Sequence, residues 1–220
     1  MPSSPVLALV GMGPGLGRSL ARKWGREGYR LALIGHDSTA LGTSVEALRD
    51  EGFEARGYAA HAGDRVGLEA AFRELGTELG DPETLIFNAS VSHEAPPSEL
   101  GIGHLESDLR ANVTGLLLAI QAVLPSMKAA GRGSLLLTGG GSALKPSATA
   151  ASLGVGKAAQ RSLFLSLAKE LEGSALRVGT LTICGFVQPG TPFDPEDLAR
   201  QMWELHTQDL ALPEIERIVV

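Results

Sequence analysis

A glycine-rich turn directly after the first apolar run is the clearest candidate for chemistry in this sequence. The apolar run 5–10 ends in alternating glycines, and a helical pattern begins at once behind them. Glycines in such a turn let the backbone approach a bound pyrophosphate, whose charge is attracted by the free N–H groups of the following helix. Glycine clusters also form plain turns, but the order strand, glycines, helix is the context that a dinucleotide site requires. The candidate residues are Gly11, Gly13, Pro14, Gly15, Leu16 and Gly17.

The elements that must position this turn alternate along the chain. Strands are expected over 5–10, 30–34, 54–59, 84–87, 134–138 and 176–183, with a seventh within 214–220. Helices are expected over 16–27, 38–51, 65–79, 106–130, 152–172 and 195–206. This alternation predicts an α/β fold with a doubly wound parallel sheet of the Rossmann type, in one domain over residues 1–220. We expect the strand order 3-2-1-4-5-6-7 and ligand binding at the carboxyl ends of the strands.

The composition limits the kinds of binding partner that we expect for this chain. A net charge of -6 without a basic cluster argues against nucleic acid or an anionic membrane surface, so we expect a small-molecule ligand. The single cysteine, Cys184, has no partner for a disulfide within the chain, which favours a reducing, cytoplasmic location. The apolar start lacks the features of a signal peptide, and no apolar run reaches spanning length. The five histidines lack metal-ligand spacing, and no metal is expected.

Several motifs resemble those of the short-chain dehydrogenase/reductase family. Gly11, Gly15 and Gly17 have its GxxxGxG spacing, and later matches follow in the family's order over essentially the whole chain. These are Asn88-Ala89, resembling its NAG motif with Ser90 in place of glycine, then Asn112 in a helix, Lys157 of YxxxK, and Gly185 of PG. The resemblance implies an NAD(P)-dependent oxidoreductase that forms a homodimer or homotetramer. It implies Asn112 and Lys157 as catalytic residues, and Asn88, Ala89, Ser90, Lys157, Gly185 and Val187 as further cofactor-binding residues.

The pattern breaks at the position of the catalytic tyrosine. Leu153 stands four residues before Lys157, and Gly140 stands where the family has its serine. In the resembled mechanism the lysine lowers the tyrosine pKa, and losing such a general acid costs roughly 10² to 10⁴ in rate. Carbonyl reduction by that route is therefore not expected, although family members that reduce carbon-carbon double bonds also lack the tyrosine. Substitute proton donors would come from Ser142, Ser147, Ser152, Thr191, His93 or His206.

The nucleotide preference depends on the end of the second strand. Gly35 replaces the acid that would hold a ribose 2′-OH, and His36 stands where NADP-using members commonly have arginine. NADP(H) is therefore favoured, but NAD stays open because Asp37 would face the same way as Gly35 if the strand continued. His61 replaces the aspartate that usually meets the adenine. Three functions remain: a reductase without the tyrosine, a silent nucleotide-binding protein, or a fold reused for cofactor-independent cyclisation or isomerisation.

Overall fold

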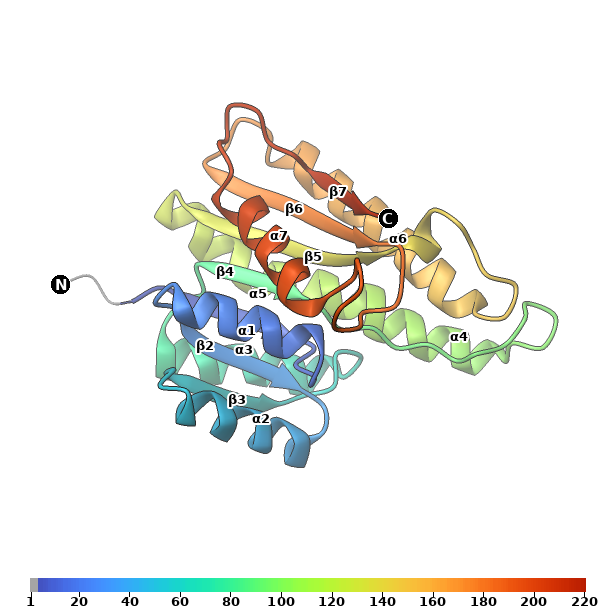
Figure 1. The fold of residues 1–220 in the computed structure, drawn as a ribbon, viewed down its shortest axis with the longest axis horizontal. Helices are drawn as coiled ribbons and strands as arrows, with labels where there is room; N and C mark the ends of the chain where they lie inside the picture. The colour runs from blue at the N-terminus through green and yellow to red at the C-terminus, as the bar shows by residue number, and fades with distance from the viewer. Residues whose placement is uncertain (1–3) are drawn as a thin grey trace.

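The computed structural model describes residues 4–220, and they form one seven-stranded parallel sheet in the order β3-β2-β1-β4-β5-β6-β7 (Figure 1). The strands are β1 (Val6–Val10), β2 (Arg30–Gly35), β3 (Ala55–Ala59), β4 (Thr84–Phe87), β5 (Gly133–Gly140), β6 (Leu176–Ile183) and β7 (Glu216–Val219). The predicted fold class and strand order are confirmed.

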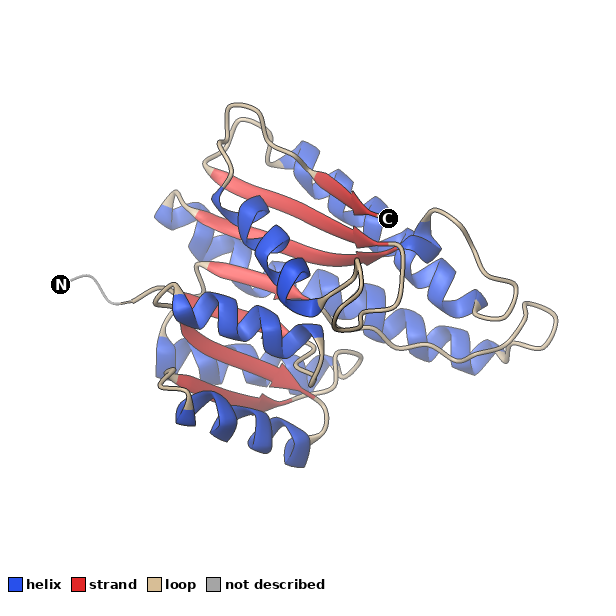
Figure 2. Ribbon diagram, in the orientation of Figure 1, coloured by secondary structure: helices blue, strands red, loops and turns tan. Residues whose placement is uncertain are grey.

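Helices cover both faces of the sheet (Figure 2). They are α1 (Leu16–Arg26), α2 (Ser38–Asp50), α3 (Arg65–Leu79), α4 (Ile102–Leu109), α5 (Gly115–Ala130), α6 (Ala151–Glu170) and α7 (Pro195–Thr207). Alternate residues of a strand point to opposite faces. Accordingly, Leu7 and Leu9 of β1 pack with α1, α2 and α7, whereas Val6 and Ala8 pack with α3, α5 and α6.

The long fourth helical segment departs from the expected range 106–130. It begins at Ile102, and a π-helical turn, η1 (Arg110–Thr114), separates α4 from α5. Ile102 is 72% exposed, so the first turn of α4 does not bury it. A π turn adds one residue to a helix, a distortion that often accompanies a functional site. Within η1 lies Asn112.

The same segment corrects the expectation about spanning length. Ile102–Ala130 is long and apolar enough to cross a membrane by length and composition. Core helices of globular proteins pass the same test, and here Leu116, Ile120 and Val123 are buried against the sheet. The segment is therefore weak evidence for a membrane span.

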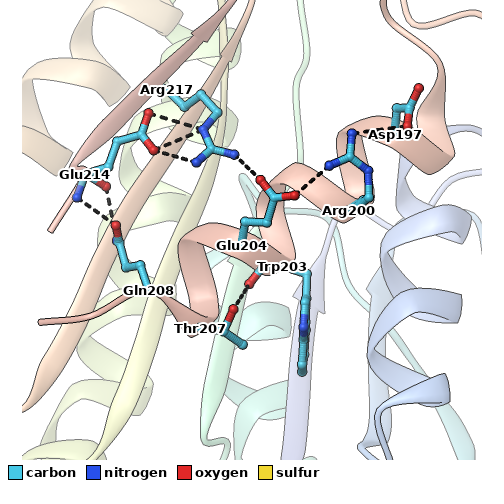
Figure 3. Close-up of polar contacts among 8 residues, drawn as sticks. All are labelled: Asp197, Arg200, Trp203, Glu204, Thr207, Gln208, Glu214 and Arg217. Atoms are coloured by element: carbon cyan, nitrogen blue, oxygen red, sulfur yellow. Dashed lines mark hydrogen bonds and ion pairs between the residues drawn. The ribbon is translucent and has the colours of Figure 1, made fainter.

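The last strand is held against α7 by a surface polar network (Figure 3). The Arg217 guanidinium donates to Glu204 of α7 and to Glu214, both at 2.6 Å. Gln208 and the Glu214 backbone exchange two hydrogen bonds, of 2.7 and 3.1 Å, across the connecting loop. Parallel backbone pairing places β7 beside β6, and Val220 lies at the rim formed by the carboxyl ends of the strands.

Candidate functional site

The glycine turn is locked to the end of β4. Gly11 has a φ of +94°, and a Cβ built there would lie 2.6 Å from Ala89 Cα. The Asn88 side chain donates to the Gly11 carbonyl at 2.8 Å and accepts from the Thr138 hydroxyl at 3.0 Å. The ends of β1, β4 and β5 are thereby tied together. Thr138 contributes to this link between the strands. The sequence did not predict its role, because that role depends on the pairing of β4 with β5.

The middle of the turn is open, although a Cβ on Gly17 would lie 3.1 Å from the Gly11 carbonyl oxygen. A Cβ on Gly13 or Gly15 would meet nothing within 4 Å. Gly15 is the N-cap of α1 and provides no side-chain cap. The Arg18 N–H donates to the Gly13 and Gly15 carbonyls at 3.0 and 3.1 Å, so the earlier N–H groups of the helix are the ones left for a ligand. This open space and these donors fit a pyrophosphate. Gly11 is needed for packing, whereas Gly13 and Gly15 leave space for a ligand.

A first cavity of about 230 Å³ lies beside the turn, at the ends of β1, β2 and β4. It is lined by Val10, Gly11, Met12, Ile34, Gly35, His36, Ala60, His61, Ala62, Asn88, Ala89, Ser90 and Val91. Asp37 does not line it, which corrects the expectation that its carboxylate faces this way. Strand β2 ends at Gly35, and Asp37 caps α2 by accepting the N–H groups of Thr39 and Ala40 at 2.9 and 3.0 Å.

A second cavity of about 800 Å³ adjoins the first, because Asn88 and Ser90 line both. The remaining lining residues include Leu16, Gly140, Ser142, Lys145, Leu153, Lys157, Cys184, Gly185, Val187 and Val220. Gly185 packs directly against the Phe193 ring, which a Cβ at this position would overlap. Of the predicted residues, Gly11, Leu16, His36, Asn88, Ala89, Ser90, Lys157, Gly185 and Val187 line one or both of these cavities, whereas Gly13, Pro14, Gly15 and Gly17 line neither.

Among the described residues that line the second cavity, Lys157 is the one charged residue that is buried. Its side chain donates to the Thr138 carbonyl at 2.9 Å, and the residue is 8% exposed. Burial disfavours the ammonium and lowers the pKa of Lys157 to about 8. Gly140 makes room for it, because a Cβ there would lie 3.3 Å from Lys157 Cγ. The lysine therefore remains mostly charged at neutral pH although its side chain is buried.

Comparison with known proteins identifies the family. The short chain dehydrogenase family model matches residues 5–197. The chain belongs to the short-chain dehydrogenase family. It is 28% identical over 204 residues, covering 90% of this chain and 80% of the relative, to 2-(S)-hydroxypropyl-CoM dehydrogenase 3 of Xanthobacter autotrophicus. It is 31% identical over 134 residues, 60% of this chain and 50% of the relative, to D-threitol dehydrogenase of Mycolicibacterium smegmatis.

Solved structures agree on the fold. The crystal structure of a metagenomic short-chain oxidoreductase in complex with NADP matches 99% of this chain and 97% of its own, with a TM-score of 0.89 and 24% identity. Members of the short-chain dehydrogenase family bind nicotinamide cofactors, and the two cavities lie where the doubly wound fold binds dinucleotides, at the carboxyl ends of the strands.

In this short-chain dehydrogenase the family's asparagine has both side-chain groups engaged. Asn112 Oδ1 accepts from the Val91 N–H at 2.9 Å, and its Nδ2 donates to the Val91 carbonyl at 2.7 Å. Its own carbonyl accepts from Gln160 at 2.8 Å. Asn112 lines neither cavity. The contacts fix the segment after β4, next to Ser90, which lines both cavities.

The candidate proton donors are scattered. Ser142 lines the second cavity, whereas the other five candidates lie outside its lining. Ser152 is buried and donates to the His93 carbonyl at 3.2 Å. The His93 ring bonds the buried Asp108 at 2.9 Å and stacks on His104 at 4.0 Å between centroids. Few of the candidate proton donors therefore lie near Leu153, the position at which the family has its tyrosine.

The remaining candidates have structural partners elsewhere. His206 is buried in the core of the opposite end of the sheet, between the hydroxyls of Tyr29 and Ser134, both at 2.9 Å. Burial lowers the pKa of His206 to about 4. Ser147 bonds Thr149, and Thr191 donates to the Gln188 carbonyl. Among the residues that the structure describes, Ser142 is thus the one predicted donor with access to the larger cavity.

Proposed function

We propose that this short-chain dehydrogenase binds NADP(H) and reduces an activated carbon-carbon double bond, or an already reactive carbonyl, without a tyrosine. The observation that carries the proposal is a cofactor cradle with open glycine positions and a buried Lys157, beside a cavity in which Leu153 replaces the phenol. The metagenomic oxidoreductase in complex with NADP, which shares the fold, supports the choice of cofactor.

Each group has a role in this reaction. The glycine turn and the start of α1 would hold the pyrophosphate, and Asn88 keeps the turn in place through its bond to Gly11. The Lys157 ammonium would hold the ribose hydroxyls, as the family resemblance implies. Bound NADPH would supply a hydride.

The apolar wall at Leu153 favours one substrate class. Hydride addition to a double bond conjugated with a carbonyl places the new charge on the substrate's own oxygen. The resulting enolate can take its proton from water, so no phenol is required. Water reaches the site, since the connection between β6 and α7 is short and leaves Phe186 93% exposed. The titratable side chains that line the larger cavity are Lys145, Lys157 and Cys184.

Binding is tested first, by calorimetric titration with NADPH, NADP⁺, NADH and NAD⁺. Gly15→Asp places a negative charge at the start of α1 and should abolish binding, whereas Gly15→Ala adds the same Cβ without the charge and separates charge from shape. Thermal unfolding of both variants controls for the fold. Failure of the unmodified chain to bind any nucleotide would refute the proposal and favour cofactor-independent chemistry.

Turnover is tested next, by NADPH oxidation with α,β-unsaturated thioesters, enones and reactive ketones. We expect enone or thioester reduction that persists when Ser142 is replaced by alanine, because water supplies the proton. The scattered proton donors favour one alternative, a nucleotide-binding protein without catalysis. Tight NADPH binding with no turnover across the three substrate classes would support that alternative.

A further inference from the structure

The larger cavity combines an apolar wall with positive charge. Among the described residues, its lining includes Lys145 and Lys157 but no aspartate or glutamate side chain. The apolar part of the wall includes Leu144, Phe186 and Val187, which are 43%, 93% and 39% exposed. Covering such side chains with a ligand is favourable, and positive charge in a site without a compensating acid attracts an anion. The lining therefore fits a ligand that has both an apolar body and a negative charge.

The two lysines differ in what they can offer to this negative charge. The Lys157 ammonium is buried and donates to the Thr138 carbonyl at 2.9 Å, and the proposed function assigns it to the cofactor. Lys145 is exposed, and its side chain forms no hydrogen bond or ion pair with any other residue that the structure describes. Lys145 is therefore the cation of this cavity that a substrate can reach. A single ammonium fits the single charge of a carboxylate better than the double charge of a phosphate.

The backbone around Lys145 is fixed to the rim of the sheet. The Lys145 N–H donates to the Gly141 carbonyl at 2.8 Å. Gly141 lies against the end of β6, since a Cβ there would be 2.8 Å from the Cα of Cys184. The next residue, Pro146, lies against the first turn of α6, where a Cβ on Gly154 would be 3.9 Å from the Cβ of Pro146. The lysine side chain therefore starts from a backbone position that is held on both sides.

We infer that Lys145 selects substrates that carry a carboxylate in addition to the double bond or carbonyl that is reduced. The Lys145 ammonium pairs with the carboxylate, while the apolar body of the substrate covers Leu144, Phe186 and Val187. The inference rests on the proposed function, because it names the substrate class of the same site. An ion pair at an exposed position strengthens binding by up to about fivefold.

Non-reacting probes test the inference without turnover. Calorimetry compares 4-phenylbutanoate with its neutral amide, 4-phenylbutanamide, on the protein alone and on the protein with NADP⁺. We expect the acid to bind about fivefold more tightly than the amide, and about 0.5 M salt to remove most of this preference. Lys145→Gln should abolish the preference, and Lys145→Arg should keep it. Lys169→Gln is the matched control and should also keep it, because it removes an exposed lysine that does not line this cavity.

Turnover gives a second readout. The substrates are an enone that carries a carboxylate and the methyl ester of the same enone, each reduced with NADPH. In Lys145→Gln the ratio of the two kcat/KM values, acid over ester, should fall about fivefold through a higher KM for the acid. A loss that appeared equally for the acid and the ester would show a structural effect of the substitution and overturn the inference.

The binding outcomes separate this inference from the proposed function. Failure of the acid to bind, equal affinity for acid and amide, or a preference that survives in Lys145→Gln would overturn the role of Lys145 and leave nucleotide binding intact. A preference that depends on Lys145, with no reduction of any enone, thioester or ketone, would instead refute the proposed function and leave the carboxylate site in place.

Discussion

Replacing Lys157 with methionine should stabilise the protein while weakening NADPH binding. The pKa of Lys157 falls from 10.5 to about 8 because the charge is buried. At about 1.36 kcal/mol per pKa unit, burying the ammonium costs about 3 kcal/mol below pH 8. Methionine removes this cost and loses the bond to the Thr138 carbonyl, worth about 1 kcal/mol. We therefore expect a net stabilisation of about 2 kcal/mol at pH 7.

The sign of the pH dependence follows from the same shift. Between pH 8 and 10.5 the unfolded chain binds more protons at Lys157 than the folded chain, so stability should rise with pH across this window. In Lys157→Met that rise should be missing. Urea unfolding of both proteins from pH 7 to pH 10.5 measures the effect. Lys145→Met is the matched control, since Lys145 lines the same cavity but is exposed, and its removal should leave stability unchanged.

Two results would refute this reasoning. One is a Lys157→Met variant that is less stable than the unmodified protein at pH 7. The other is a stability of the unmodified protein that does not rise above pH 8. If the expected result is found together with weaker NADPH binding by calorimetry, the lysine is retained at the expense of stability, as is common for groups that serve a ligand.

Three more variants test the site and its frame. Gly11→Ala should destabilise by more than 2 kcal/mol, from positive φ and overlap with the end of β4, whereas Gly13→Ala, in open space, should not change the urea midpoint. His206 has a pKa lowered to about 4, so stability should fall as pH drops from 6.5 toward 4, and His206→Gln should remove that fall in thermal melts. Leu153→Tyr with Gly140→Ser should increase NADPH-dependent ketone reduction at least 10²-fold, and no gain would show that the cavity lacks another family element.

Much of the site was accessible from the sequence because its key spacings are local. The glycine turn lies within seven residues, and a turn between a strand and a helix places its N–H groups at the helix start whatever the rest of the fold does. Leu153 and Lys157 are four residues apart on one helix, so they share a face. The spacing from Lys157 alone therefore showed that leucine stands at the position of the family's tyrosine. The alternation of apolar runs with helical patterns likewise determined the doubly wound sheet.

Other features depended on how separate elements pack, which local pattern does not specify. Whether Asp37 could reach the ribose depended on where β2 ends, and because it ends at Gly35, Asp37 caps α2 instead. The burial that lowers the pKa of Lys157 arises where α6 packs against the end of β5, an element far from it in the chain. The pairing of His36 with His61, at the ends of adjacent strands, has the same origin. Residue types and short spacings determined which groups this protein carries, whereas sheet pairing and helix packing decided which of them meet.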